Sequence, residues 1–281
     1  MLLSIRHETT YRYSHPVDHS VQIVRLTPRP ETGQRTLRWK LSSPGRQLEQ
    51  TDAFGNITHL VTVDDSVREI HLLAEGRVDT SDAEGWVPTE EGGLSPLAFL
   101  AETALTAPDA RIRDLAASWD RNRLAEPGGL VDLAVALRDA VVWEPGITTV
   151  EHDAAEALAL GRGVCQDHAH LFASVCRLHG VPARYVSGYL HTGESSVASH
   201  AWAEAWLGED QGWFSVDITN GSPTGPKHCR LAVGRDYLDA GPVRGVRRGG
   251  GDEALHVEVH VSGRPAPQRS RRERQQRERQ Q

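Results

Sequence analysis

The N-terminal part of the chain alternates between apolar and polar positions, which is the pattern of half-buried β-strands. Polar residues such as Ser4, Arg6 and Glu8 alternate with a second series, which consists of Leu3, Ile5, His7, Thr9, Tyr11 and Tyr13. Similar short runs cover residues 21–26, 37–41, 57–63 and 67–78, with turn residues such as Gly55 and Asn56 between them. We therefore expect a β-rich N-terminal domain over residues 1–85.

After about Ser95 the spacing of apolar residues becomes helical. Helices are expected over residues 110–124 and 129–143, separated by Gly128 and Gly129. A shorter helix is expected over residues 154–160, with Asp153 as its N-cap. Another helix should begin near Cys165 and end at Gly180, where glycine suits the left-handed position after a helix.

Strand patterns return in the last third of the chain. They cover residues 183–190, 199–207, 212–218 and 255–261. Together with the helices they predict an α+β core over residues 86–263. Residues 264–281 have no apolar face and contain seven Arg and two Glu, so we expect a disordered tail.

Composition narrows the functional classes. The formal net charge of −7 argues against a general nucleic-acid-binding protein, and the Arg-rich tail is the single hint of such a partner. No run approaches the roughly 18 apolar residues of a membrane span, and the first residues lack the features of a signal peptide. The three cysteines form no close pair, which argues against a disulfide framework and favours a reducing cytoplasm.

Cys165 is the one cysteine in a setting typical of a nucleophile. It falls in the first turn of its predicted helix, where free N–H groups and the helix dipole favour a thiolate. Cys176 lies three turns further along among apolar residues and is expected to be buried, and Cys229 is expected to be structural. A cysteine nucleophile also requires a base, and the base requires an orienting group.

The segment "SHAWAEAWLGEDQGWFSVDI" predicts that base and its partner. His200, Trp202 and Glu204 share one face of a strand, and alanines at 201, 203 and 205 share the other, as required for close packing against a helix. A two-residue turn in the hairpin would pair His200 directly with Asp217. A four-residue loop would place Asp217 opposite Trp202, still diagonal to His200 and within reach. Both registers bring Asp217 within reach of His200, so the predicted catalytic residues are Cys165, His200 and Asp217.

These residues also resemble a known family. "GVCQDHAHLFASVCRLHGVPARYVSGY", "SHAWAEAW" and "GWFSVDITN" are similar to the core of the transglutaminase-like superfamily, in its bacterial and archaeal branch. "YRYSHPV" and "VRLTPRP" resemble the β-rich N-terminal region carried by that branch. The resemblance implies a papain-like core, with a Cys-bearing helix on an antiparallel sheet. It also implies Cys165 as nucleophile, His200 as general base and acid, and Asp217 as orienting carboxylate. Ile218 stands where the family commonly has proline.

The predicted reaction is acyl transfer at an amide of a peptide or protein, through a thioester on Cys165. Hydrolysis gives a peptidase or amidase, which we favour; transfer to an amine gives a transglutaminase. Beside the Cys165 N–H, Gln166 and Trp143 are candidate oxyanion donors. Trp202 is a candidate groove wall, and Glu204 is a candidate substrate contact or the partner of an arginine. No cofactor and no metal are expected.

Two other classes remain open at the level of sequence. A metal-dependent hydrolase could use Cys165, His168 and His200 as ligands, but no C-x-x-C follows His200 and Glu204 to complete a zinc deaminase signature. A non-catalytic transglutaminase-like scaffold would keep the fold and bind a partner. Failure of Cys165 to react with thiol probes would favour the scaffold.

Overall fold

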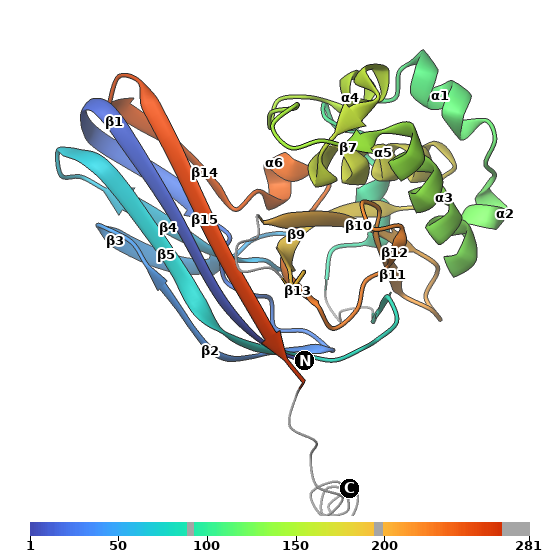
Figure 1. Ribbon diagram of the computed structural model, residues 1–281, viewed down its shortest axis with the longest axis horizontal. Coiled ribbons are helices and arrows are strands. Elements are labelled where there is room, and N and C mark those ends of the chain that lie inside the picture. The colour runs from blue at the N-terminus through green and yellow to red at the C-terminus, as the bar shows by residue number, and fades with distance from the viewer. Residues whose placement is uncertain (89–92, 194–198, 266–281) are drawn as a thin grey trace, which may run out of the picture.

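The computed structural model describes residues 1–88, 93–193 and 199–265, and it contains two antiparallel sheets and a layer of helices (Figure 1). The expected α+β class, with a β-rich N-terminal part and a helix packed on an antiparallel sheet, is confirmed. The long strands of the first sheet diverge from the helical half of the molecule (Figure 1). None of the helices in the described ranges is long and apolar enough to cross a bilayer.

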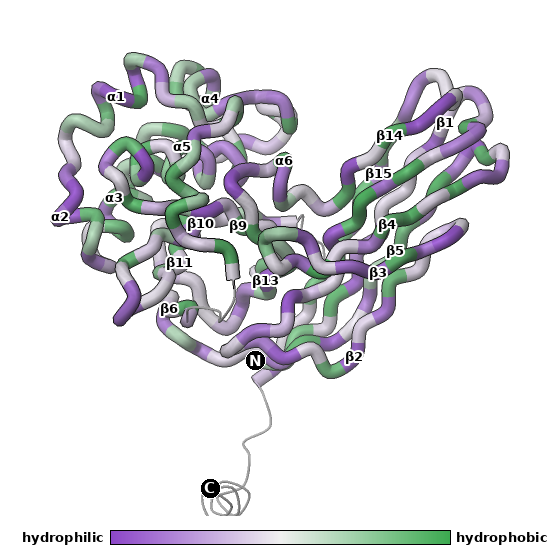
Figure 2. The backbone as a smooth tube through the Cα atoms, turned by 180° about the vertical axis from the view of Figure 1, so that it is seen from behind, coloured by the Kyte–Doolittle hydropathy of each residue, from purple (hydrophilic) through white to green (hydrophobic). Residues whose placement is uncertain are grey.

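The first sheet has seven strands in the order β2-β5-β1-β4-β3, and β14 and β15 also pair with β1. The strands are β1 (Leu2–Val24), β2 (Gln34–Ser42), β3 (Arg46–Thr51), β4 (Ile57–Val63), β5 (Val67–Thr80), β14 (Val243–Gly249) and β15 (Glu253–Arg264). Hydrophobic and hydrophilic residues follow one another repeatedly along these strands, as expected for strands with one buried face (Figure 2). The two strands predicted within residues 3–26 form one continuous strand, and β3, whose residues are all exposed, has no alternation by which it could be predicted.

The last two strands lie in a different sheet from the one that their position in the chain suggested. Residues 2–13 of β1 pair with β15, and residues 2–12 pair with β5 on the other side. Further along β1, residues 17–24 pair with β14 and residues 20–24 pair with β4. β14 and β15 therefore belong to the first sheet, although the predicted core range of residues 86–263 includes them. Hydrogen bonding to the free side of β1 satisfies backbone groups that would otherwise form an open edge. The predicted tail lies, apart from residues 264 and 265, outside the described residues.

The second sheet has six strands in the order β12-β11-β10-β9-β13, with β6 paired to β11. Its strands are β6 (Trp86–Val87), β9 (Ala183–Leu190), β10 (His200–Trp206), β11 (Trp213–Asp217), β12 (Ser222–Pro223) and β13 (His228–Gly234). Two short parallel strands, β7 (Val142–Trp143) and β8 (Arg162–Gly163), lie apart from it. The helical segments are η1 (Pro96–Leu100), α1 (Ala110–Ala116), α2 (Arg121–Leu124), α3 (Pro127–Ala140), α4 (Ala154–Leu160), α5 (Cys165–Leu178) and α6 (Tyr237–Ala240).

Helix α5 packs on the alanine face of β10, as the alternation predicts. Ala201, Ala203 and Ala205 are buried in one apolar cluster with Leu171, Phe172 and other residues of α5. Small side chains on the strand allow the helix to approach closely, so the Cys-bearing end of α5 is fixed relative to the sheet. Gly180 follows the helix with a φ of 69°, the left-handed conformation expected at its end.

The glycine pair at residues 128 and 129 does not separate two helices. It lies in the first turn of α3, which begins at Pro127, a residue suited to the first helical position. A Cβ on Gly129 would lie 1.8 Å from the carbonyl oxygen of Arg123, so close packing against α2 explains this glycine. The helix expected over residues 110–124 is divided by Asp120, which caps α2.

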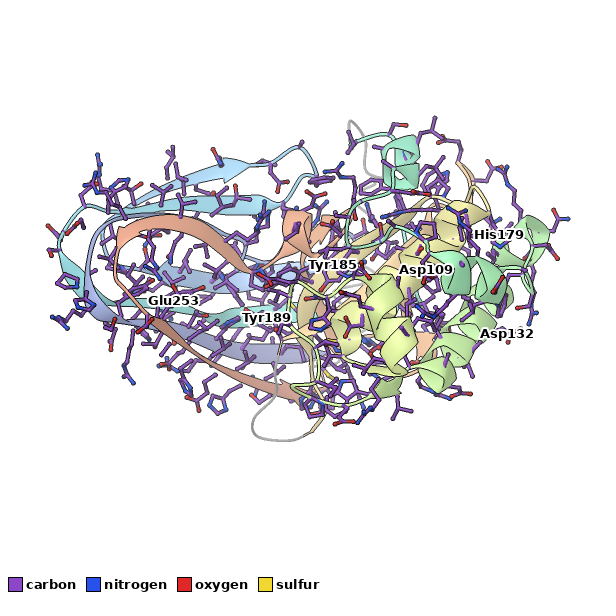
Figure 3. The ribbon with its side chains drawn as sticks, turned by 90° about the horizontal axis from the view of Figure 1, so that it is seen from above. Asp109, Asp132, His179, Tyr185, Tyr189 and Glu253 are labelled. Atoms are coloured by element: carbon purple, nitrogen blue, oxygen red, sulfur yellow. The ribbon has the colours of Figure 1, made fainter. Side chains whose placement is uncertain are left out.

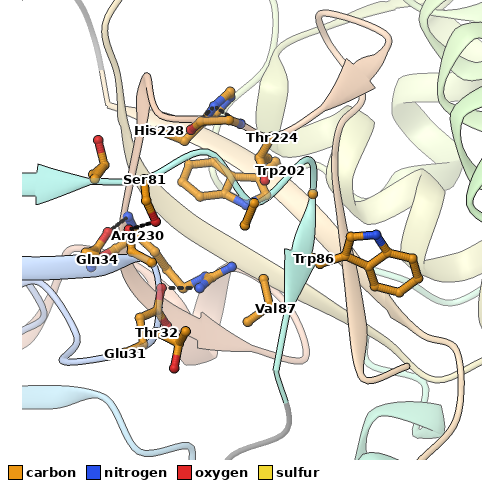
Figure 4. A pocket seen from close by; sticks show the side chains of 15 residues that line it. Glu31, Thr32, Gln34, Ser81, Trp86, Val87, Trp202, Thr224, His228 and Arg230 are labelled. Atoms are coloured by element: carbon orange, nitrogen blue, oxygen red, sulfur yellow. Dashed lines mark hydrogen bonds and ion pairs between the residues drawn. The ribbon is translucent and has the colours of Figure 1, made fainter. Parts of the chain in front are cut away.

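The two sheets share a core and a buried polar contact. Tyr189, Cys229 and Leu231 from the second sheet pack in the same apolar cluster as residues of the first, and Tyr189 lies at the junction of the two halves (Figure 3). Gln34 donates to the Arg230 carbonyl oxygen at 2.8 Å and accepts from the Arg230 N–H at 2.8 Å (Figure 4). The N-terminal sheet is therefore attached directly behind the strands of the second sheet.

Candidate active site

Cys165 is the first residue of α5, and the loop before it is fixed by a carboxylate in the first turn. Asp167 Oδ2 accepts the Val164 N–H at 2.7 Å and the Thr148 hydroxyl at 2.7 Å. A Cβ on Gly163 would lie 2.7 Å from the same oxygen, so glycine is needed for this close approach. The arrangement holds the thiol at a helix N-terminus, where the N–H groups and the helix dipole favour an anion.

The β10–β11 hairpin has the longer of the two predicted loops. Leu207 N–H donates to the Gly212 carbonyl, residues 208–211 form the loop, and Trp206 pairs with Trp213. Continuing this register puts Asp217 opposite Trp202 and diagonal to His200. His200 Nε2 lies 2.8 Å from Asp217 Oδ2, so the diagonal position still allows a direct hydrogen bond.

Asp217 is a buried carboxylate with several hydrogen-bond donors. Besides His200, it accepts the Asn220 N–H at 3.2 Å, the Asn220 amide at 2.6 Å and His228 Nε2 at 3.0 Å. Burial alone would raise the pKa of Asp217, but the hydrogen bonds from His200 and His228 and their charges hold it well below its usual range. The carboxylate is therefore ionised throughout the neutral range and is fixed in orientation.

His200 connects this carboxylate to the thiol. Burial lowers the pKa of His200, but hydrogen bonds to Asp217 and Cys165 and the negative charges of both groups prevail and raise it to about 10. Because Nε2 is bonded to Asp217, Nδ1 is the ring nitrogen available to the thiol. The ring is thus an imidazolium at neutral pH, with one N–H directed at the carboxylate and the other at sulfur.

The other two cysteines are inaccessible. Cys176 and Cys229 are fully buried, and burial raises the pKa of both thiols. Cys165 is partly exposed, so it is the single cysteine among the three that solvent and ligands can reach.

A groove of about 700 Å³ opens at Cys165 and His200. Its walls come from the loop around Trp143 to Val150, from β9 and the start of β10, from Thr219 and Asn220 after β11, and from the segment around Tyr237 to Pro242. The groove is large enough for several residues of a peptide. The thiol and the imidazole are therefore both accessible to one ligand.

Of the four further site candidates from the sequence, two lie at the groove and two do not. Trp143 and Gln166 both line the groove: Trp143 is 52% exposed at the rim, whereas Gln166 is 8% exposed and its Nε2 has no hydrogen-bond partner. Trp202 and Glu204 do not line it. Trp202 is buried behind His200, with ring centroids 6.0 Å apart, and Glu204 is fully buried between two arginines.

The predicted wall and substrate contact are therefore not at the groove. Trp202 packs against Val186 and Val233 on the face of the sheet opposite α5, and a Cβ on Gly188 would lie 2.5 Å from its ring. Glu204 accepts from Arg184 Nε at 2.6 Å and also from Arg230. Side chains on this face of β10 point toward the N-terminal sheet (Figure 4), and His200 reaches the groove because it begins the strand.

Among the described residues, one group has the geometry to hold a metal ion. A ligand atom from each of His200, Asp217 and His228 lies within 4.8 Å of the others. These atoms already form the hydrogen bonds given above, which explains their proximity without an ion. The alternative ligand His168 is turned away: its ring nitrogens lie 2.9 Å from Thr219 Oγ1 and 2.8 Å from the Val141 carbonyl oxygen.

Sequence reasoning missed His228 and Asn220. Asn220 follows Asp217 by three residues, a spacing that allows an Asp side chain to accept from a nearby N–H. His228 is one of 14 histidines, and it reaches Asp217 because β13 lies next to β9 in the sheet. Its Nδ1 lies 3.1 Å from the Gly225 nitrogen and 3.3 Å from the Gly225 carbonyl oxygen, and its Nε2 lies 3.0 Å from the Asp217 carboxylate.

Two family descriptions match the chain: "Bacterial transglutaminase-like N-terminal region" over residues 3–79 and "Transglutaminase-like superfamily" over residues 113–218. An uncharacterised protein of Mycobacterium leprae is 32% identical over 278 residues, which cover 92% of this chain and 98% of that protein. A Pseudomonas aeruginosa protein-glutamine gamma-glutamyltransferase is 43% identical over 67 residues, which cover 20% of this chain and 10% of that protein.

One solved structure has the same overall fold. It comes from Cytophaga hutchinsonii and is described as a "Putative Cysteine Protease". Its TM-score is 0.69 at 21% sequence identity, and the match covers 95% of this chain and 92% of that chain. At this identity, the match bears on the fold alone.

Proposed function

Since the chain belongs to the transglutaminase-like superfamily, we propose that it catalyses thiol-dependent acyl transfer at an amide bond, with hydrolysis as the favoured outcome. The observation that carries this proposal is the hydrogen-bonded series from Asp217 through His200 to Cys165 at the opening of the groove. A nucleophile, a base in contact with it and a group that orients the base are what such a reaction requires.

In the first half of the proposed reaction, the Cys165 thiolate attacks the amide carbonyl carbon and a tetrahedral oxyanion forms. His200 then donates its Nδ1 proton to the leaving nitrogen, the C–N bond breaks, and a thioester and a free amine result. In the second half, neutral His200 takes a proton from water, and the hydroxide formed attacks the thioester. The C–S bond then breaks and a carboxylic acid is released, which restores the Cys165 thiolate and the His200 imidazolium.

Donors for the oxyanion come from the start of α5 and from the groove. The Cys165 N–H at the helix N-terminus is the first donor, since it is not used within the helix. The Gln166 amide supports a role as second donor because its Nε2 is buried at the groove without a partner. The Trp143 indole at the rim is the competing candidate.

In this proposal, His228 and Asn220 are positioning residues. Both donate to Asp217, so they fix the carboxylate that in turn fixes the His200 ring. Trp202 covers this group from behind: its ring centroid lies 5.3 Å from that of His228, and it is fully buried. Exclusion of water strengthens the hydrogen bonds between the imidazolium and the carboxylate.

Transfer to an amine is the second candidate outcome. It is supported by the 67-residue similarity to the Pseudomonas aeruginosa protein-glutamine gamma-glutamyltransferase. The same thioester serves both outcomes, and the acceptor that reaches it, water or a primary amine, decides between them. The two outcomes therefore need one experiment with both acceptors.

The proposal is tested by mass spectrometry of the protein after exposure to a library of peptides that carry electrophilic carbonyl groups. We expect an adduct on Cys165, none on Cys176 or Cys229, and none in Cys165→Ala. With amide substrates, release of a free acid supports hydrolysis, and formation of a new amide with added amine supports transamidation. If Cys165 remains unreactive to the library and to iodoacetamide at neutral pH, the chain is a binding scaffold and the proposal is wrong.

A further inference from the structure

Among its described residues, the groove beside Cys165 is lined by no charged side chain other than the reacting pair. Among the described residues that line it there is no Asp, Glu, Lys or Arg, although these types make up 25% of the chain. Beside the polar Gln166, Asn220 and His200, its larger side chains are apolar or aromatic: Trp143, Val150, Tyr185, Leu190, Tyr237 and Pro242. A ligand placed against these described residues meets apolar surface, and the His200 ring is the one charged group among them.

Several polar groups of the groove are already engaged. The Ser187 hydroxyl donates to the Ala240 carbonyl at 2.7 Å, the Asn220 amide donates to Asp217, and the Thr219 hydroxyl bonds to His168. The polar backbone beneath the aromatic wall is also satisfied, because the Tyr237 N–H donates to His170 Nε2 at 3.1 Å. These bonds leave few groups that could solvate a charged side chain of a substrate.

The aromatic side chains that line the groove are held in place by contacts between their rings. Tyr185 and Tyr237 pack edge to face with centroids 6.4 Å apart, and Tyr185 also contacts the buried His170 ring at 5.2 Å. Tyr185 lies on β9, an inner strand of the second sheet, near the junction of the two halves of the molecule (Figure 3). A preformed apolar wall favours ligands that match it and requires little ordering when they bind.

We propose that this groove selects peptide substrates in which the residue beside the scissile amide is apolar or aromatic, and that it disfavours acidic and basic residues at that position. The inference rests on the proposed acyl transfer at Cys165. A charged side chain in the groove would lose its hydration without gaining a partner, whereas an apolar side chain would gain burial. Pocket contacts of this kind discriminate between substrates by about 10-fold or more.

Val150 offers a way to change this selectivity without disturbing the core. It lines the groove and is 48% exposed, so a charged side chain can be accommodated there. Val150→Asp should attract a basic probe, and Val150→Lys should attract an acidic one. Val246 on β14 is 73% exposed and lies outside the groove, so Val246→Asp is the matched control.

The test uses peptide vinyl sulfones that differ in one residue next to the reactive group: Leu, Phe, Glu or Lys. The second-order rate of Cys165 modification is measured for each, with iodoacetamide as a probe that does not depend on the groove. We expect Leu and Phe probes to react at least about 10-fold faster than Glu and Lys probes. Val150→Asp should raise the Lys-to-Glu rate ratio, Val150→Lys should lower it, and Val246→Asp should leave it unchanged.

The outcomes separate this inference from the proposed function. Equal rates for all four probes, with Cys165 still alkylated by iodoacetamide, would overturn the inference alone. An unchanged Lys-to-Glu ratio in both Val150 variants would also overturn it, because the residue beside the amide would then lie elsewhere. No reaction of Cys165 with any probe, iodoacetamide included, would overturn the proposed function instead.

Discussion

Asp217 accepts hydrogen bonds from two histidines, and only one of the two touches the thiol. His200 bonds to both Asp217 and Cys165, whereas the second nitrogen of His228 bonds to the backbone of Gly225. The roles of the two rings are therefore set by their second partners. Sequence spacing predicted the first pair because strand geometry limits which residues can meet across a hairpin. It missed His228 because β13 reaches the site only through the fold.

At the scale of single residues, the raised pKa of His200 predicts a pH-dependent contribution to stability. Its pKa rises from the ordinary 6.5 to about 10 in the folded protein, so the folded state binds the proton more tightly. This stabilisation is fully present below about pH 6.5 and is lost as the pH rises toward 10. Urea unfolding of the wild type and of His200→Gln should therefore show a free-energy difference that is largest at pH 6 and declines toward pH 10. A difference that does not change with pH would contradict this prediction.

At the scale of elements, α5 and the β10–β11 hairpin were predictable from the sequence. The helix starts at Cys165, and the alanines that it packs against alternate along β10. The hairpin register was limited to two possibilities. In the structure Gly208 begins the longer loop and Gly212 follows it, both with positive φ. By contrast, Gly128 and Gly129 misled the helix prediction, because glycine is also used for close packing between helices.

Asp167 is predicted to affect both the stability of α5 and the function of the groove. Asp167→Ala removes the hydrogen bonds to the Val164 N–H and the Thr148 hydroxyl, and so should cost about 1–2 kcal/mol. It should also reduce the rate of Cys165 acylation, since Thr148 lies in the loop between the groove residues Gly146 and Val150. Chemical denaturation and the vinyl sulfone rates provide the two measurements.

Asp153→Ala is the matched control for this substitution. Asp153 caps α4 by accepting the Glu156 N–H at 2.8 Å, and it does not line the groove. Its loss should cost about 1 kcal/mol and leave the acylation rate unchanged. Equal acylation rates in the two variants would mean that Asp167 acts on stability alone.

At the scale of the whole molecule, the two sheets are joined by a buried group of charges. Arg230 on β13 pairs with Glu31 between β1 and β2 (Figure 4). Arg230 also pairs with Glu204 on β10. Glu204 also pairs with Arg184, whose guanidinium lies 4.1 Å from the Trp213 ring centroid. The sequence could not predict this group, nor the pairing of β14 and β15 with β1, because the partners are far apart in the chain and local patterns do not specify which sheet a strand joins.

The charge of Glu204 is predicted to stabilise the whole fold. Burial raises the pKa of Glu204, but Arg230 and Arg184 prevail and lower it to about 2, so its stabilising effect is present above the ordinary 4.5 and lost as the pH falls toward 2. Glu204→Gln removes the negative charge that two buried arginines share, and it should lower the free energy of unfolding by about 3 kcal/mol at pH 7. Glu69→Gln, which removes one partner of the exposed Arg12 pair, should cost less than about 1 kcal/mol. Similar losses of unfolding free energy in the two variants would show that the buried group does not hold the sheets together.

The proposed reaction depends on the sulfur of Cys165, which carries the acyl group between the two half-reactions. The most direct measurement is turnover of one confirmed amide substrate by the wild type and by Cys165→Ala, with unfolding curves to show that both are folded. Because the thiol forms the covalent intermediate, the substitution should reduce kcat by at least about 1,000-fold while unfolding free energy stays near the wild-type value. Full turnover by folded Cys165→Ala would show that the Cys165 thiol is not the nucleophile.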